Sequence, residues 1–210
     1  MQHLKMFNRI EILAGDEQVV IEGPVLLEQL ESYYMDEGLS TFRPADQQYE
    51  ALKEIAESPE GRIILARIDQ RIVGYVTYHY PDELERWSES NMDNLLELGA
   101  IEVIAEFRGY KIAQNLLRVT MLDDAMEDYI IIATNYYWHW DLYGTGVTAA
   151  DYRKIIRKVM LAGGLEYMAT DDPDICTHSA NCLTVRIGSR VSNESVRRFD
   201  SIRLKNQYMY

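Results

Sequence analysis

Residues Leu95–Met121 have the sequence LLELGAIEVIAEFRGYKIAQNLLRVTM, in which a strand pattern changes into a helix pattern. Leu95–Ile104 is short, apolar and β-branched toward its end, which is typical of a buried strand. Arg108-Gly109 then interrupts the pattern. After Lys111 the apolar residues follow the spacing of one helix face, namely Ala113, Leu116, Leu117 and Met121. The segment therefore predicts a buried strand, a turn, and a helix that begins directly after the turn.

A strand, turn and helix in this order can bind phosphate. The N–H groups of the first helical turn have no partner within the helix, and the helix dipole favours negative charge beside them. Arg108 adds a positive charge in the turn. An ordinary connection with its arginine in water would give the same pattern, so the spacing alone leaves both interpretations open.

The same residues resemble the coenzyme A segment of GNAT-type N-acetyltransferases. The resemblance is carried by Val103, Glu106-Phe107-Arg108-Gly109, Ala113 and Leu116-Leu117. In that superfamily an Arg/Gln-x-x-Gly-x-Gly/Ala loop wraps the pyrophosphate of acetyl-CoA. Arg108 and Ala113 match this loop, whereas Lys111 stands where the family prefers Gly. Glycine lets the backbone approach the phosphates closely, while a lysine still donates its N–H and adds a positive charge.

The resemblance implies acetyl-CoA as the cofactor and an α/β (α+β) acyltransferase fold. That fold has a mixed, mostly antiparallel central sheet, flanked by helices and splayed at the cofactor strand. The cofactor-binding residues that it implies are Ile101, Val103, Arg108, Gly109, Tyr110, Lys111, Ile112 and Ala113. We expect a single domain over residues 1–210, with an N-terminal hairpin and helices in 1–58, the central sheet and cofactor core in 59–134, and the acceptor side in 135–210.

Local patterns predict the other elements. Alternating or apolar runs bounded by turn residues predict strands at Asn8–Ala14, Gln18–Glu22, Arg62–Arg67, Arg71–Tyr80, Tyr129–Thr134, Leu165–Thr170 and Asn181–Ile187. Helical spacing predicts helices after Pro24, where Tyr33 and Tyr34 join the apolar face, after Pro44, at Asp151–Ala162, where Ile155 faces inward, and at Glu194–Leu204. The Tyr129–Thr134 strand should run parallel to the cofactor strand, because a helix connects the two. Trp87, in the polar insertion Pro81–Asn94, is expected to pack on the core.

Strings spread over nearly the whole chain resemble one subgroup of the superfamily, the acetoin-utilization acetyltransferases of Bacillus-type bacteria. They are Ile21–Val25, Pro59–Ile64, Gly74–Tyr78, Leu84–Glu89, Tyr136–Leu142, Tyr152–Ile155, Ala180–Leu183 and Tyr208–Tyr210. This resemblance implies acetylation of a lysine of acetyl-CoA synthetase, which inactivates that enzyme. Composition could not have indicated such a substrate.

Composition excludes some partners and compartments. The 210 residues carry a net charge of −13, which argues against a nucleic-acid binder. An acidic surface suits a partner that presents a lysine among basic residues, although solubility alone explains it equally well. Two cysteines imply no disulfide framework, and no apolar run approaches the length of a membrane helix. We therefore expect a cytoplasmic protein without a membrane segment, and a homodimer is left open.

Acetyl transfer to an amine needs a base, because a lysine ammonium must lose a proton before it attacks the thioester. The candidates are Glu97 and Glu102, both on the cofactor strand. Burial in an apolar strand would raise the pKa of either carboxyl, although each could instead form a salt bridge at the strand edge. We rank Glu97 first, because some protein-lysine acetyltransferases of the superfamily carry their base at that position. The tyrosine that many members use as an acid is replaced here by Met160.

Four aromatic residues follow the second buried strand and are candidates for acceptor binding: Tyr136, Tyr137, Trp138 and Trp140. Aromatic walls could hold a lysine stem and its cation, although a packed core would use the same residues. Cys176-x-His178-x-x-x-Cys182 lacks the density of a zinc pattern, and we expect no metal site. The sequence thus favours a protein-lysine N-acetyltransferase. A small-molecule amine acetyltransferase and a non-catalytic, CoA-binding regulator remain as alternatives.

Overall fold

A computed structural model describes residues 1–208 of the chain. Met209 and Tyr210, which end the last of the subgroup strings, lie outside the described residues. Contacts divide the chain into two compact units. The N-terminal unit comprises Gln2–His79 and Leu98–Met126, and the C-terminal unit comprises Met1, Tyr80–Glu97 and Glu127–Tyr210. The expectation of a single domain, with its internal boundaries near residues 58 and 134, stays a prediction.

The N-terminal unit contains a sheet whose strands follow the order β1-β2-β4-β5-β6. Its strands are β1 Asn8–Ala14, β2 Glu17–Gly23, β4 Arg62–Ile68, β5 Arg71–His79 and the Leu98–Val103 part of β6, which spans Leu95–Val103. The pairs β1–β2, β2–β4 and β4–β5 are antiparallel, and the short β3, Tyr34–Met35, runs parallel to β5. These strands match the predicted hairpins to within two residues at each end.

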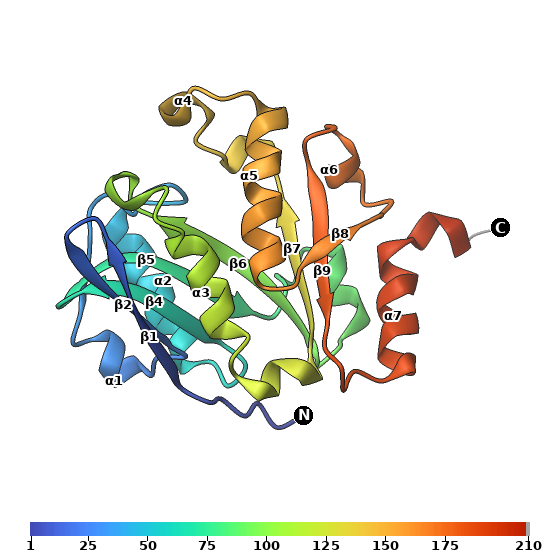
Figure 1. Cartoon of the computed structure of the whole chain (residues 1–210). Helices are drawn as coiled ribbons and strands as arrows, with labels where there is room; N and C mark the ends of the chain where they lie inside the picture. The colour runs from blue at the N-terminus through green and yellow to red at the C-terminus, as the bar shows by residue number, and fades with distance from the viewer. Residues whose placement is uncertain (209–210) are drawn as a thin grey trace. The chain divides into compact units, whose positions relative to one another are not determined.

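Helices pack on this sheet through apolar faces. The helical elements of the unit are α1 Leu27–Leu30, α2 Ala45–Glu57, η2 Ala105–Phe107 and α3 Ile112–Thr120. Helix α3 packs against β2, β4 and β5, whereas α2 packs against β4 and β5 from the opposite face (Figure 1). Leu116 and Leu117 of α3 are fully buried, as the helical spacing predicts. The helix after the cofactor strand is therefore confirmed.

The C-terminal unit contains strands in the order β6-β7-β9-β8, with β7 at Ile130–Asn135, β8 at Glu166–Met168 and β9 at Cys182–Ile187. Residues Leu95–Glu97 of β6 pair in parallel with Ile130–Ile132 of β7, which confirms the predicted parallel pairing. The β7–β9 and β8–β9 pairs are antiparallel. Strand β6 thus contributes its first residues to one unit and the rest to the other.

Some of the helices of the C-terminal unit contribute to a separate apolar cluster. The helices of the unit are η1 Arg86–Ser90, η4 Tyr137–His139, α4 Leu142–Thr145, α5 Ala149–Ala162, α6 Pro173–Cys176, α7 Asn193–Arg203 and η5 Lys205–Tyr208, and η3 Asp124–Asp128 precedes β7. Those that contribute to the cluster are η1, α6 and α7. Trp87 is buried and stacks on Phe199 of α7, with ring centroids 6.2 Å apart. The expectation that Trp87 packs on the core is confirmed. The cluster continues through Ile130, Ile132 and Val185.

Two local predictions were wrong. The helix after Pro24 ends at Leu30, and Tyr34 lies in a strand because its N–H donates to the carbonyl of Gln70 at 2.9 Å. Ile155 was expected to face inward from α5, yet its side chain is 45% exposed. Of the residues in α5 only Met160 is buried, so this helix is less covered than its apolar spacing suggests.

Candidate active site

The loop that enters α3 has the geometry of an anion site. Arg108, Gly109, Tyr110 and Lys111 are all exposed, and α3 begins directly after them at Ile112. The helix has no side-chain cap at its N-terminus. Its first N–H groups are therefore available to a ligand, and the exposed side chains of Arg108 and Lys111 add positive charge.

Lys111 adopts the backbone conformation that glycine adopts most easily. Its φ is +62° and its ψ is 21°, in the left-handed region that costs a side-chain-bearing residue about 1 kcal/mol or more. Gly109, two residues earlier, also has a positive φ, of +91°. Lys111 occupies the position where the GNAT loop prefers glycine, and its positive φ is one that glycine adopts at little cost. Buried Ile112 and half-buried Ala113 anchor the helix start.

Glu102 is a buried carboxylate whose two oxygens each accept a hydrogen bond. The hydroxyl of Tyr75 donates to Oε2 at 3.0 Å, and the N–H of Thr41 donates to Oε1 at 2.8 Å. Burial, followed by the negative charge of Glu102, raises the pKa of Tyr75. Tyr75 therefore stays a donor, and Glu102 ties the segment before α2 to the strand between half-buried Ile101 and Val103.

A pocket of 520 Å³ opens in the segment that contains Thr41. It is lined by Glu37, Ser40, Phe42, Arg43, Pro44, Ala45 and Asp46. Two carboxylates beside an aromatic ring suit a cationic side chain with an apolar stem. This pocket could not be predicted from the sequence, because its only local signal is the helix start near Pro44.

Glu97 is as buried as Glu102 but has a different environment. Both side chains are 6% exposed, yet Glu97 accepts a hydrogen bond from Thr134 Oγ1, at 2.9 Å, and lies against a second carboxyl group, that of Glu85. Burial, followed by the negative charge of Glu85, raises the pKa of Glu97 to about 8. A carboxyl group with such a pKa can exchange a proton near neutral pH, which a general base requires.

The aromatic segment forms a partly exposed stack. Tyr136 and Trp138 lie with ring centroids 4.6 Å apart, and Trp138 is 52% exposed. The ring of Tyr137 lies 4.1 Å from that of His178, and Trp140 stacks on Tyr152 at 5.3 Å. Of residues 136–140 none is buried, so the segment presents aromatic surface more than it fills a core.

The structure groups the predicted residues by unit. Glu97 and the aromatic segment belong to the C-terminal unit, and Glu102, Ile101, Val103 and the loop from Arg108 to Ala113 belong to the N-terminal unit. Glu85 was not among the predicted site residues, because it occurred only as part of the string Leu84–Glu89. Within residues 1–208 no group of three or more His, Cys, Asp or Glu side chains is arranged to hold a metal. No helix in the same range is long and apolar enough to cross a membrane.

Comparisons with known proteins identify the family of the chain. Residues 26–141 match the Acetyltransferase (GNAT) family. The chain is 56% identical over 210 residues to the acetoin utilization protein AcuA of Bacillus licheniformis, with 100% of both chains covered. It is 52% identical to AcuA of Bacillus subtilis over the same length, again with 100% of both chains covered.

A solved structure is also very similar. It is that of the acetoin utilization protein from Exiguobacterium sibiricum, which has a TM-score of 0.96 and 53% identity, and the match covers 99% of this chain and 98% of that chain. The predicted fold class and the predicted cofactor are therefore correct. This chain belongs to the GNAT acetyltransferase family and is an acyltransferase that uses acetyl-CoA.

Proposed function

We propose that this protein transfers the acetyl group of acetyl-CoA to a lysine of acetyl-CoA synthetase, inactivating that enzyme during acetoin and acetate metabolism in the cytoplasm. The relatives named acetoin utilization protein support the metabolic context. The observation that carries the chemistry is Glu97, a buried carboxyl group with a pKa near 8 on the strand that leads to the cofactor loop.

Each group of residues has its own role in the proposed reaction. Arg108, Lys111 and the N–H groups at the start of α3 bind the pyrophosphate, and the backbone of Ile101 and Val103 binds beside the thioester. When bound, acetyl-CoA supplies an activated acetyl group. Glu97 takes one proton from the lysine ammonium, directly or through a water molecule, so that the nitrogen can form the amide bond as the carbon–sulfur bond breaks.

A protein acceptor suits the exposed aromatic segment and the charge of the chain. The faces of Tyr136, Tyr137, Trp138 and Trp140 can hold a lysine stem and its ammonium. A net charge of −13 favours approach of a lysine that lies among other basic residues. The open pocket at Glu37–Asp46 supports the alternative of a small amine acceptor, because its two carboxylates, beside one arginine, can contact a free cationic molecule.

The test is mass spectrometry of acetyl-CoA synthetase after incubation with this protein and acetyl-CoA. We expect one acetylated lysine with the wild type, a rate about 100-fold or more lower with Glu97→Gln, and a KM for acetyl-CoA about 10-fold higher with Arg108→Ala. Arg118→Ala is the matched control, because Arg118 is an exposed arginine on α3 that follows the first helical turn.

The alternatives give different results. Acetylation of free diamines without acetylation of the synthetase would indicate a small-molecule enzyme. A stable complex with the synthetase, formed without acetylation and preserved in Glu97→Gln, would indicate a non-catalytic regulator. Full activity of Glu97→Gln would refute the assignment of the base.

A further inference from the structure

Glu85 and Glu97 form a pair of carboxyl groups in the C-terminal unit. Glu97 is buried on β6, and Glu85 precedes η1 in the polar segment that follows β5. The two carboxyl groups lie close enough to interact with one another. Oε2 of Glu85 is buried and has no hydrogen-bond partner within the described part of the chain, so this oxygen is free to take a proton.

The groups around this pair are mainly acidic or neutral. Asp82 lies on the same segment as Glu85, Thr134 and Tyr136 come from β7 and the residues after it, and Asp172 and Asp174 come from the start of α6. Burial and the charges of Asp82 and Asp172 raise the pKa of Glu85, as burial and Glu85 raise the pKa of Glu97. Two close carboxyl groups in such surroundings do not both ionise near neutral pH.

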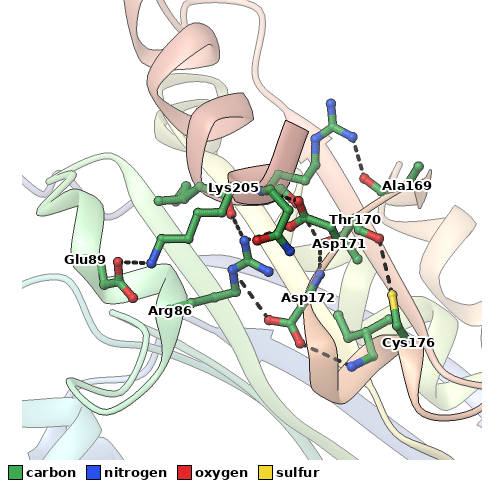
Figure 2. Close-up of polar contacts among 12 residues, drawn as sticks. Arg86, Glu89, Ala169, Thr170, Asp171, Asp172, Cys176 and Lys205 are labelled. Atoms are coloured by element: carbon green, nitrogen blue, oxygen red, sulfur yellow. Dashed lines mark hydrogen bonds and ion pairs between the residues drawn. The ribbon is translucent and has the colours of Figure 1, made fainter. Parts of the chain in front are cut away.

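The cation next to Glu85 in the chain is held elsewhere. Arg86 donates from Nη2 to Asp171 Oδ1 at 2.8 Å and to the carbonyl of Ile202, at the end of α7, at 2.6 Å (Figure 2). Its Nε lies 3.8 Å from Asp172 Oδ2. Arg86 therefore pairs with the carboxylates at the start of α6, and among the ion pairs that the structure describes within residues 1–208 none joins a cation to Glu85 or Glu97.

The same contacts fix the position of Glu85. Lys205 is bonded to Glu89 of η1, and the N–H of Asn206 donates to Asp171 Oδ2 at 2.6 Å, so the end of the chain is bound both to η1 and to the loop before α6 (Figure 2). Beside Arg86, the N–H of Glu85 donates to the carbonyl of Asp82 at 2.9 Å, and Ser88 Oγ donates to the carbonyl of Glu85 at 2.8 Å. These contacts hold the backbone of Glu85 in place at the start of η1.

We propose that Glu85 is a positioning residue for acetyl transfer, which holds one proton jointly with Glu97 and sets when Glu97 can accept another. This inference rests on the proposed role of Glu97 as the base. When the pair has lost the shared proton, Glu97 takes one proton from the acceptor ammonium and the pair returns to its singly protonated state. The amine then attacks the thioester, the thiolate leaves with the electrons of the carbon–sulfur bond, and the remaining nitrogen proton goes to the thiolate. The proton on the pair returns to solvent, so each turnover releases one proton in total.

The test follows Glu97 itself, by NMR titration of side-chain carboxyl carbons in the full-length protein. In Glu85→Gln the titration midpoint of the Glu97 carboxyl group should fall by about one pH unit, which is the size of effect that one close charge produces. In Glu85→Asp, which keeps the charge, it should stay raised. Glu83→Gln is the matched control, because Glu83 is an exposed glutamate of the same segment and its removal should leave the midpoint unchanged.

A second measurement separates this inference from the proposed function. The acidic limb of the kcat/KM profile should move to lower pH in Glu85→Gln by as much as the NMR midpoint does, whereas a merely structural role would lower the rate without moving the limb. An unchanged midpoint in a folded Glu85→Gln protein, judged by thermal unfolding, would refute the shared proton. A midpoint that moves while the rate profile stays fixed would refute Glu97 as the base and, with it, the catalytic role of the pair.

Discussion

Strand β6 carries two buried glutamates that differ in their hydrogen-bond donors and in the charge of their neighbours. Glu97 and Glu102 lie five residues apart on this strand and are equally buried. Glu102 accepts hydrogen bonds from the hydroxyl of Tyr75 and the N–H of Thr41. Glu97 accepts one from Thr134 and lies against Glu85, a group that is itself acidic.

The difference shows that burial alone does not make a base. In Glu102 each of the two buried side-chain oxygens accepts a hydrogen bond, so neither is left without a partner. With such donors Glu102 acts as an anchor that connects β6 to the segment before α2. With one donor and an acidic neighbour, Glu97 can change its protonation near neutral pH, as a catalytic group must.

The largest expected effect is on the pH dependence of stability. The pKa of Glu97 is 4.5 as a reference and about 8 in the folded chain, so the unfolded chain releases this proton first as the pH rises. Wild-type stability should therefore be highest near pH 5 and fall by about 3–5 kcal/mol toward pH 8.5. Glu97→Gln has no such proton, so its advantage over the wild type should grow over that interval in urea unfolding. A constant difference between pH 5 and pH 8.5 would contradict the raised pKa.

A smaller effect on stability is expected when Glu102 is substituted. Glu102→Gln exchanges two hydrogen bonds to a charged group for neutral ones, which should cost about 1–2 kcal/mol at neutral pH. The acidic limb of the kcat/KM profile for acetyl transfer should lie at the same pH as in the wild type. Tyr75→Phe removes one donor, and the double variant should lose less than the sum of the two single losses, because both substitutions act on one bond. A displaced limb in Glu102→Gln would instead favour Glu102 as the base.

Local sequence patterns predicted most of the elements but few of the contacts between them. The strand at Asn8–Ala14 and the helix after Lys111 follow from apolar periodicity bounded by turn residues, and both are present. Tyr34 was placed in a helix because its spacing fits one, whereas backbone pairing with β5 holds it in a strand. Ile155 was correctly placed in a helix, but the helical periodicity did not reveal that its side chain is exposed.

The parts of the candidate site that lie within one continuous segment could be predicted from the sequence. The loop from Arg108 to Ala113 is contiguous, and its motif could be recognised directly. Burial of Glu97 also followed from the apolar strand around it. The contact with Glu85 joins residues that a turn, η1 and the start of β6 separate, and the hydrogen bond from Thr41 to Glu102 spans 61 positions. No periodicity encodes such contacts, so they had to come from the structure.

The smallest effect is expected at Lys111, where charge and backbone conformation can be separated. Lys111→Gly relieves the left-handed strain and should raise the free energy of unfolding by about 0.5–1 kcal/mol, after allowing for the greater freedom of glycine in the unfolded chain. Its KM for acetyl-CoA should rise about 3-fold, because one exposed charge at a helix N-terminus is lost. Lys111→Met loses the same charge but keeps the strain, so it should match the rise in KM without the gain in stability. If Lys111→Gly were less stable than Lys111→Met, the loop would not hold residue 111 at positive φ. Equal KM values in both variants would show that the lysine contributes through its charge and that the backbone already has the geometry the family obtains with glycine.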